Sequence, residues 1–361
     1  MKFTRTAKQA LLAGVTVALL ASCSSLNYYR QAAQGQLTLL SDARPIDDWL
    51  NDQSTPPRLR TRLATARQIR TFAVQALALP DNQSYKNYAA LNRPFVLWNV
   101  VATPELSLKP IQWCFPVAGC VSYRGYYSKD AAVEYGKTLR AEGNDVQVGG
   151  VPAYSTLGWF NDPLISTFIN YPDAELARLI FHELSHQVLY ISGDTQFNES
   201  FASAVEEAGV ERWLAGFGND AMRENYLRFS IRKNEFLQLL LKCRRALEAN
   251  YASPATVEEK RLTKLRLFHQ LQEDYVLLKA SWGGFAGYDR FFAEPLSNAH
   301  LASIAAYNDL VPAFRALLAQ EKTFPRFYAA AKALAELDKD ERHRRLKAMA
   351  AAPSAAVAAA H

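Results

Sequence analysis

The sequence predicts an α+β fold that is predominantly α-helical, and three observations support this prediction. Of the 361 residues, 49% are hydrophobic and 12% are aromatic, which is enough for one large core or two coupled ones. Apolar residues recur every three or four positions over long stretches, which is the period of a helix. Runs of β-branched and aromatic residues that suit strands occur before residue 160. We therefore expect many helices and one small sheet.

Most of the predicted elements have recognisable start or stop signals. The double proline at 56–57 opens a helix, and Pro80-Asp81-Asn82 follows its end. A turn-rich, tyrosine-rich segment separates the two strand candidates. The expected elements are a helix over 26–40, a helix over 56–78, strands over 93–101 and 146–156, helices over 176–191 and 197–213, a hairpin of two long helices over 219–282 that breaks at 252–254, a glycine-rich loop over 282–292, and two shorter helices, one ending near 318 and one over 324–349.

The N-terminus has the pattern of a secretory signal. A basic start and a short apolar stretch lead to Leu20-Ala21-Ser22-Cys23, which resembles a bacterial lipobox. By that resemblance Cys23 becomes a lipidated first residue that anchors a soluble domain to a bilayer, in the outer membrane facing the periplasm. An ordinary cleaved signal is the alternative. Removal of 1–22 lowers the net charge from +6 to +3, which is too little to indicate nucleic-acid binding.

The other three cysteines divide into a pair and a single residue. Cys114 and Cys120 have five residues between them, including a proline and a glycine that can turn the chain back. In an oxidising periplasm we expect a disulfide between them, with two separate thiols as the alternative. Cys243 stands in a helical pattern, and we expect an inert thiol in the core.

His182, Glu183 and His186 interrupt the apolar stretch LARLIFHELSHQVLYI. Ionisable groups are costly to bury without partners, so these three residues need an explanation. On a helix His182 and His186 lie about 40° apart, one turn above the other. His-Glu-x-x-His on a helix is a zinc motif, in which the imidazoles bind the metal and the glutamate is the general base for a water that zinc activates.

A third metal ligand is expected from the next helix. The segment 192–195 is a short turn, in which Gly193 suits the end of the first helix. The two helices should therefore be antiparallel neighbours, with the first turn of the second facing the histidines. Glu199 lies in that turn and is our first choice. Glu206, seven residues later on the same face, is the alternative. Whichever glutamate does not bind the metal is expected to hold a histidine ring in its tautomer.

Here the chain resembles the glutamate-zincin (gluzincin) metallopeptidases, whose third ligand is a glutamate in an Asn-Glu-x-x-Ala-like helix. The matching residues are Asn198-Glu199-Ser200-Phe201-Ala202. By this resemblance Asn198 and Glu206 lie in the shell behind the ligands, and Glu206 matches a second glutamate of zinc aminopeptidases in this clan. Clan members with an aspartate four residues after the ligand would place it at 203. This chain has Ser203 there.

A closer resemblance covers nearly the whole mature chain. The lipobox is followed by YYRQAAQGQLTLLSDARPI, CFPVAGCVSYRGYY, GVPAYSTLGWFNDP, LIFHELSHQ, GDTQFNESFA and NAHLASIAAY. Together these segments are similar to a family of bacterial lipoproteins described as predicted aminopeptidases. The resemblance implies a zinc peptidase with one Zn²⁺ per chain. The regions are then 1–22 (lipoprotein signal), 23–110 (helical region with a strand), 111–218 (zincin catalytic core), 219–349 (helical region with the long hairpin) and 350–361 (disordered tail).

Several further residues are candidates for supporting roles. His300 or Tyr307 is expected to donate a hydrogen bond to the oxyanion, with a helix-capping cluster as the alternative. The segment 150–157 is placed to pair with an extended peptide, and its glycines would let a peptide backbone approach. The expected substrate contacts are Gly150 and Tyr154 in that segment, with Tyr123 and Arg124 as weaker candidates. An aminopeptidase also needs an acidic group for the substrate α-amine, which Glu206, Glu207 or Asp162 could supply.

The residues thus predict a lipid-anchored zincin that hydrolyses peptide bonds. Its partners are a peptide substrate and a bilayer, without nucleic acid. A zinc endopeptidase is one alternative. Another is a non-catalytic envelope lipoprotein, in which a structural metal site is closed by four protein ligands and the hairpin binds a partner.

Overall fold

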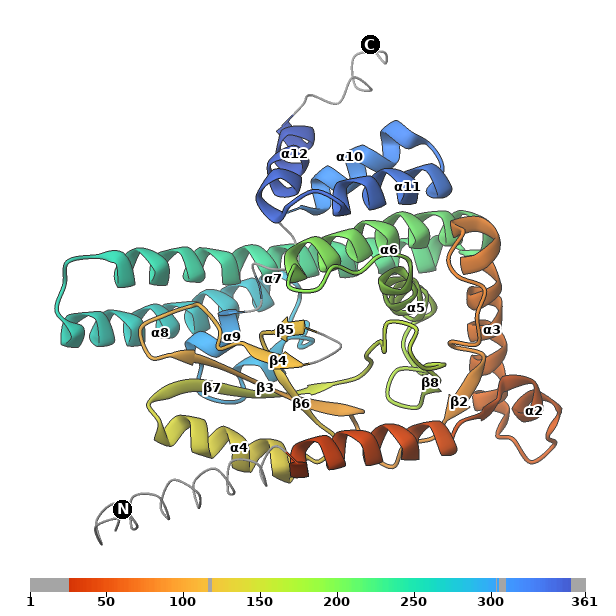
Figure 1. The fold of residues 1–361 in the computed structure, drawn as a ribbon, viewed down its shortest axis with the longest axis horizontal. Coiled ribbons are helices and arrows are strands. Elements are labelled where there is room, and N and C mark those ends of the chain that lie inside the picture. The colour runs from red at the N-terminus through yellow and green to blue at the C-terminus, as the bar shows by residue number, and fades with distance from the viewer. Residues whose placement is uncertain (1–25, 116–118, 303, 305–309, 352–361) are drawn as a thin grey trace, which may run out of the picture.

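Helices surround small sheets in the computed structural model, which describes residues 26–115, 119–302, 304 and 310–351 (Figure 1). The predicted α+β fold, mostly α-helical, is confirmed. After a helix over residues 26–41, the helices are α2 (Ile46–Asn51), α3 (Pro57–Leu77), α4 (Lys129–Ala141), α5 (Asp173–Val188), α6 (Thr195–Phe217), α7 (Asp220–Ala252), α8 (Val257–Ser281), the 3₁₀ helix η1 (Asp289–Phe292), α9 (Asn298–Ala302), α10 (Val311–Glu321), α11 (Phe324–Ala335) and α12 (Lys339–Ala351).

The strands form two three-stranded sheets and a hairpin. They are β1 (Arg44–Pro45), β2 (Asn87–Ala89), β3 (Leu97–Pro104), β4 (Trp113–Phe115), β5 (Gly119–Val121), β6 (Arg124–Tyr126), β7 (Asn144–Val151) and β8 (Leu164–Ile165). The sheet orders are β1-β2-β8 and β6-β3-β7, and β4 pairs with β5. In the second sheet β3 is antiparallel to both neighbours, which makes β7 an edge strand. No described strand pairs with the other side of β7.

The two predicted strands are present with shifted ends. β3 begins at Leu97 instead of residue 93, because Pro94 has no N–H to donate to a ladder. β7 ends at Val151, directly before Pro152, instead of reaching residue 156. α4 was not expected from the sequence; Ser128 caps it by accepting a hydrogen bond from the Ala131 N–H. The sheet was expected only before residue 160, whereas β8 comes later.

The helix pair α5 and α6 is the centre of the molecule. The back of α5 carries Leu176, Ile180 and Leu184, all fully buried, against a core that includes Phe201 and Val205 of α6. Burial of each such side chain contributes about 1.5–3 kcal/mol. α3 packs against α5, and α10 packs against α6, so the pair is enclosed by helices from both ends of the chain.

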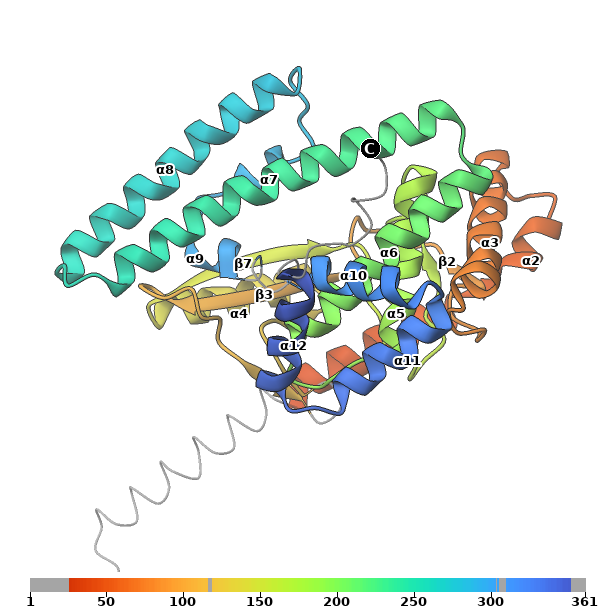
Figure 2. The ribbon, with the colours of Figure 1, turned by 90° about the horizontal axis from the view of Figure 1, so that it is seen from above.

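The predicted helical hairpin is present as α7 and α8, which extend well beyond the rest of the molecule (Figure 2). Asn219 caps α7, and a capping box of Thr256 and Glu259 starts α8. The hairpin has its own buried cluster, which contains Cys243. Burial raises the pKa of this thiol to about 12, so it stays protonated, as expected for a thiol in the core.

The last predicted helix is two helices in the structure. The sequence pattern indicated one helix over 324–349, but α11 ends at Ala335 and α12 begins at Lys339. Asp338 causes the break, because its carboxylate accepts a hydrogen bond from the Glu341 N–H and starts α12 anew. The turn lets α12 pack back on α10.

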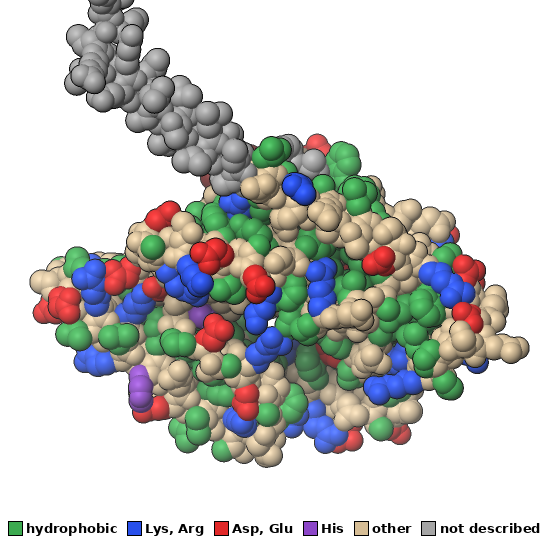
Figure 3. Space-filling model, turned by 90° about the horizontal axis from the view of Figure 1, so that it is seen from below, with side chains coloured by type: hydrophobic (Ala, Val, Ile, Leu, Met, Phe, Trp, Pro, Cys, Tyr) green, Lys and Arg blue, Asp and Glu red, His purple; other side chains and the backbone are tan. Residues whose placement is uncertain are grey.

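The largest buried cluster contains residues from Leu39 to Leu346, so the N-terminal, central and C-terminal parts of the chain share one core. The predicted domain boundaries stay predictions. Lys and Arg side chains alternate with Asp and Glu side chains on the face that Figure 3 shows. Within the described ranges, no helix has both the length and the apolar character needed to cross a bilayer.

Candidate metal centre

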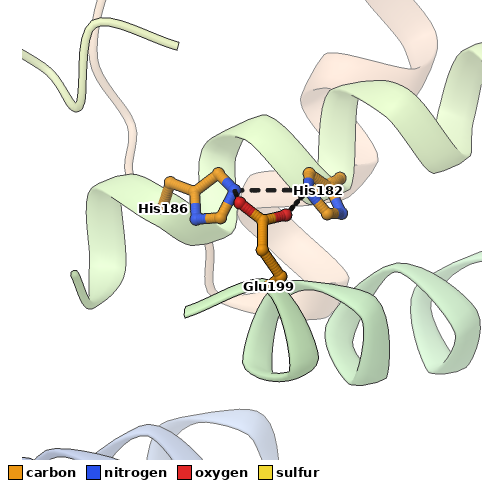
Figure 4. A group of neighbouring side chains, drawn as sticks. All are labelled: His182, His186 and Glu199. Carbon is orange, nitrogen blue, oxygen red and sulfur yellow. Dashed lines mark hydrogen bonds and ion pairs between the residues drawn. The ribbon is translucent and has the colours of Figure 1, made fainter. Parts of the chain in front are cut away.

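Three side chains converge between α5 and α6 (Figure 4). His182 and His186 project from α5 toward the carboxylate of Glu199, which lies in the first turns of α6. The two Nε2 atoms are 3.2 Å apart, and His182 Nε2 is 3.2 Å from Glu199 Oε2. His186 Nε2 is 3.8 Å from Glu199 Oε1. The potential ligand atoms of His182, His186 and Glu199 all lie within 4.8 Å of one another, so these residues could hold a metal ion. We call these three residues the ligand group.

The spacing of the three side chains fits zinc. Zinc binds histidine nitrogen and carboxylate oxygen at about 2.0–2.2 Å in a tetrahedron, which places neighbouring ligand atoms roughly 3.3 Å apart. Two of the three separations are 3.2 Å and the third is 3.8 Å. Two histidines and one carboxylate are also a common ligand set of catalytic zinc sites, which keep a fourth position open.

Glu206 lies behind His182 instead of beside His186. Its Oε2 is 2.7 Å from His182 Nδ1, so Nδ1 donates its proton there and Nε2 is left on the side of Glu199. Glu206 is 1% exposed, and Arg178 and Lys233 also contact its carboxylate, at 3.3 and 3.5 Å. The structure therefore places Glu199 in the ligand group and Glu206 in the supporting position.

The charges around His182 determine its protonation in the absence of metal. Burial disfavours the charged imidazole, but Glu206 and Glu199 outweigh burial and raise the pKa of His182 to about 10. Burial lowers the pKa of His186 to about 4. Although burial opposes it, the hydrogen bond from His182 holds the pKa of Glu199 below its usual value. At neutral pH the His182 imidazole is thus the one member of this ligand group that carries a positive charge, and its Nε2–H donates to Glu199.

Glu183 lies next to His182 of the ligand group. It lines a cavity of about 340 Å³ together with His182, which opens between α5, α6 and α7. Burial, opposed by the charge of His182, raises the pKa of Glu183 to about 7. A carboxylate with a pKa near the working pH can both accept and return a proton.

The connection between α5 and α6 fixes the position of Glu199. α5 ends at Val188, so Gly193 does not end it; Gly193 has a φ of +81° within the loop. Asn198 closes this loop through two hydrogen bonds of 2.8 Å to the backbone of Ile191. Asn198 was expected to support the metal ligands from behind. In the structure its side chain binds the loop backbone instead.

The start of α6 is also held from the C-terminal end of the chain. Asp194 caps α6 by accepting a hydrogen bond from the Phe197 N–H. The Asp194 carboxylate is 1% exposed and pairs with Arg342 at 3.1 Å and with His343 at 2.9 Å. α12 thereby holds the helix start that carries Glu199.

The edge strand β7 leads to the cavity. Pro152 and Ala153, directly after β7, line the cavity with His182 and Glu183. A Cβ on Gly149 would meet nothing within 4 Å, whereas a Cβ on Gly150 would lie 2.2 Å from the Phe95 ring. Phe95 fills the side-chain face of Gly150, so a substrate could approach Gly150 only along the edge of the strand, and the predicted contact stays a prediction. Gly149 offers the open face instead.

A disulfide hairpin lies against the loop between α5 and α6. Cys114 and Cys120 form the expected disulfide between β4 and β5. A Cβ on Gly119 would lie 2.0 Å from Ser192 Oγ, so the hairpin touches the α5–α6 loop. Tyr123 follows this hairpin, and the residue as a whole is 41% exposed. Burial and then the charge of Glu199 raise the pKa of Tyr123.

Other predicted contact residues have structural partners. Arg124 stacks on the Tyr28 ring, with its guanidinium carbon 4.0 Å from the ring centre. The Tyr154 hydroxyl is hydrogen-bonded to the Tyr127 hydroxyl at 2.6 Å and also to Gln36. Arg124 packs away from the ligand group, and Tyr154 ties the segment after β7 to the N-terminal helix.

The structure does not bring His300 to the ligand group. His300 lies in α9, where Ser297 and Phe291 are its neighbours, and α9 packs near the Asp145 end of β7. At 3.3 Å per strand residue, Asp145 and Pro152 are about 23 Å apart. The expected oxyanion role is therefore not supported for His300. Tyr307 and Cys23 lie outside the described residues.

Two residues of the cavity were missed in the sequence analysis. Arg178 lies four residues before His182, so helical spacing alone would have placed it on the same face. Lys233 comes from the hairpin helix α7, and no local pattern connects it to the zinc motif.

Comparison with known proteins gives one match. A family model with the description "putative aminopeptidase" covers residues 27–346. No curated protein and no solved structure matches the chain.

Proposed function

Since the chain belongs to the putative aminopeptidase family, we propose that it is a zinc-dependent peptidase of the gluzincin type. The observation that supports this proposal best is the convergence of His182, His186 and Glu199 at separations that suit zinc. Glu183 lies beside them in a cavity large enough to admit part of a peptide. A metal motif, a base and a cavity together are what metal-assisted hydrolysis requires.

Zinc bound to these three residues would polarise the scissile carbonyl and lower the pKa of a water to about 7. Glu183 takes a proton from the attacking water as the oxygen bonds to the carbonyl carbon. When the C–N bond breaks, Glu183 returns this proton to the leaving nitrogen. Its pKa near 7 suits both transfers. Glu206 keeps the His182 imidazole in the tautomer that presents Nε2.

Tyr123 is our choice for the additional hydrogen-bond donor to the oxyanion. The charges of Glu199 and Glu183 contribute to the raised pKa of its hydroxyl, which supports a position within electrostatic reach of the ligand group. Its raised pKa keeps the phenol protonated at neutral pH, so it can donate. This assignment replaces His300, which lies near the opposite end of β7.

The edge of β7 is suited to align an extended substrate. Its outer side is unpaired among the described strands, and the chain after it enters the cavity. A peptide that adds as a further strand would be held by main-chain hydrogen bonds, independently of its side chains. The lipobox at Cys23 supports a location in the cell envelope, with the enzyme anchored to a bilayer by lipid.

The decisive test is the variant Glu183→Gln. We predict that it keeps its zinc and its fold but loses peptide hydrolysis by at least about a hundredfold, because the base is gone. Hydrolysis of peptides and zinc content are measured side by side. Glu207→Gln is the matched control, since Glu207 pairs with Arg315 instead of facing the ligand group. Equal hydrolysis by Glu183→Gln and wild type would contradict the proposal, as a purely structural metal site would be indifferent to this change.

A further inference from the structure

The cavity beside His182 contains two cations that the proposed chemistry does not use. Arg178 of α5 and Lys233 of α7 both line it, next to His182 and Glu183. The Lys233 side chain is 41% exposed and that of Arg178 is 24% exposed. A group entering the cavity from solvent therefore meets Lys233.

The candidate carboxylates for a substrate amine already have partners. Glu206 is contacted by Arg178, His182 and Lys233. Glu207 pairs with Arg315 at 2.9 Å. Asp162 is 3% exposed and accepts hydrogen bonds from the Thr156 N–H and hydroxyl, each at 2.8 Å. Beyond the base Glu183, none of the described acids that line this cavity is left to hold a cationic α-amine.

Lys233, in contrast, has hydrogen-bonding capacity to spare. Its ammonium carries three donors. Among the described residues its one ion pair is with Glu206, at 3.5 Å, which is at the limit of a hydrogen bond. Arg178 pairs with Glu175 through Nε and with Glu206 through one terminal nitrogen, so it is held rigidly beside Lys233. Lys233 is therefore the cation of this cavity wall that still has donors for the carboxylate of an entering group.

We propose that Lys233, supported by Arg178, forms a subsite for a carboxylate of the peptide substrate. This inference rests on the proposed peptidase function and specifies its substrate class. The carboxylate is either an Asp or Glu side chain near the scissile bond or the free C-terminus of a short peptide. The enzyme then selects for an acidic group instead of a free α-amine, which departs from the activity that the family description names.

The first experiment compares peptides on the zinc-loaded wild type. Internally quenched alanine-rich peptides carry Glu, Gln or Lys at each position in turn, with the N-terminus free or acetylated and the C-terminus free or amidated. We expect about tenfold higher kcat/KM for Glu than for Gln at one position, or for the free than for the amidated C-terminus, since the charged hydrogen bond is lost. The first comparison detects a side-chain carboxylate, and the second detects the C-terminal carboxylate. Acetylation of the N-terminus should have little effect.

Variants of Lys233 then test the residue itself. Lys233→Met keeps the apolar stem and should remove the difference in kcat/KM between the acidic and the neutral peptide. Lys233→Glu should reverse this preference, so that the peptide with Lys has the higher kcat/KM. Lys242→Glu is the matched control, because Lys242 lies on the same helix and pairs with Asp274 on the surface. It should behave as the wild type does.

A binding measurement separates this inference from the proposed function. Calorimetric titration of the Glu183→Gln protein with the best acidic peptide and its neutral counterpart reports the subsite without turnover. Tighter binding of the acidic peptide, lost in Glu183→Gln/Lys233→Met, supports the subsite even if no hydrolysis is found. Equal kcat/KM for acidic and neutral peptides in an active wild type, or hydrolysis abolished by N-acetylation, overturns the subsite and leaves the peptidase proposal intact.

Discussion

His182 connects the ligand group to the rest of the molecule. One ring nitrogen faces Glu199 and His186, and the other is 2.7 Å from Glu206. The sequence predicted the histidine pair, the base and both glutamates from spacing alone, because helical geometry fixes which residues share a face. It could not show which glutamate faces the metal, since residues seven apart on one helix lie on the same side and only the packing of α6 on α5 separates their roles.

Replacing Glu206 should weaken the metal site without removing a ligand. In Glu206→Gln the carboxylate that orients His182 is lost, so we predict that zinc affinity falls by about 10- to 100-fold. Competition titration with a chromophoric chelator measures this affinity. Glu207→Gln, one residue along the same helix and paired with Arg315, should leave it unchanged. Unaltered affinity in a folded Glu206→Gln would contradict the supporting role.

The protonation of His182 makes a prediction about pH. In the absence of metal its pKa is raised to about 10, whereas burial lowers that of His186 to about 4. At pH 8 zinc must therefore displace one proton, from His182, and affinity should rise by about tenfold per pH unit up to pH 9. Calorimetry in buffers of different ionisation enthalpy measures the protons released, and we expect about one per zinc. Zinc binding at pH 8 without proton release would show that His182 is neutral beforehand.

At the scale of elements, most of the long helices were predictable because they have periodic apolar residues and recognisable ends. The hairpin of α7 and α8 is the clearest example, with its break at 252–254. Three features escaped prediction for physical reasons. The break before α12 depends on one capping aspartate, Asp338; β7 stops at Pro152; and the short strands β1 and β2 form through pairing instead of through a local pattern.

The role of α12 as a support for the ligand group is testable. Arg342 is 6% exposed and pairs with Asp194, the cap of the helix that carries Glu199. In Arg342→Gln we predict weaker zinc binding by about tenfold, since removing one partner of a buried ion pair strongly destabilises the pair. Zinc competition and thermal unfolding are measured together. Arg344→Gln is the matched control on the same helix, because Arg344 pairs only with Glu341 at the surface. Equal zinc affinities of the two variants would contradict the proposal that α12 supports the ligand group.

The whole molecule places its ligand group where several elements meet. α5 and α6 supply the ligands, the end of edge strand β7 and helix α7 complete the cavity, and α12 holds the start of α6. The sequence alone predicted the first pair and the presence of the strand, but neither Lys233 nor α12 could be connected to the zinc motif. Both belong to helices far along the chain, and only tertiary packing brings them near (Figures 1 and 2).

Metal content is the most direct test of the zinc peptidase proposal. Residues 24–361 are purified without the lipid anchor, dialysed at pH 8, and compared with the variant Glu199→Ala. We predict about one zinc per chain in the wild type, largely lost in the variant, because Glu199 is one of the three residues that we propose hold the metal. A well-folded wild type that retains no zinc would contradict the proposed function.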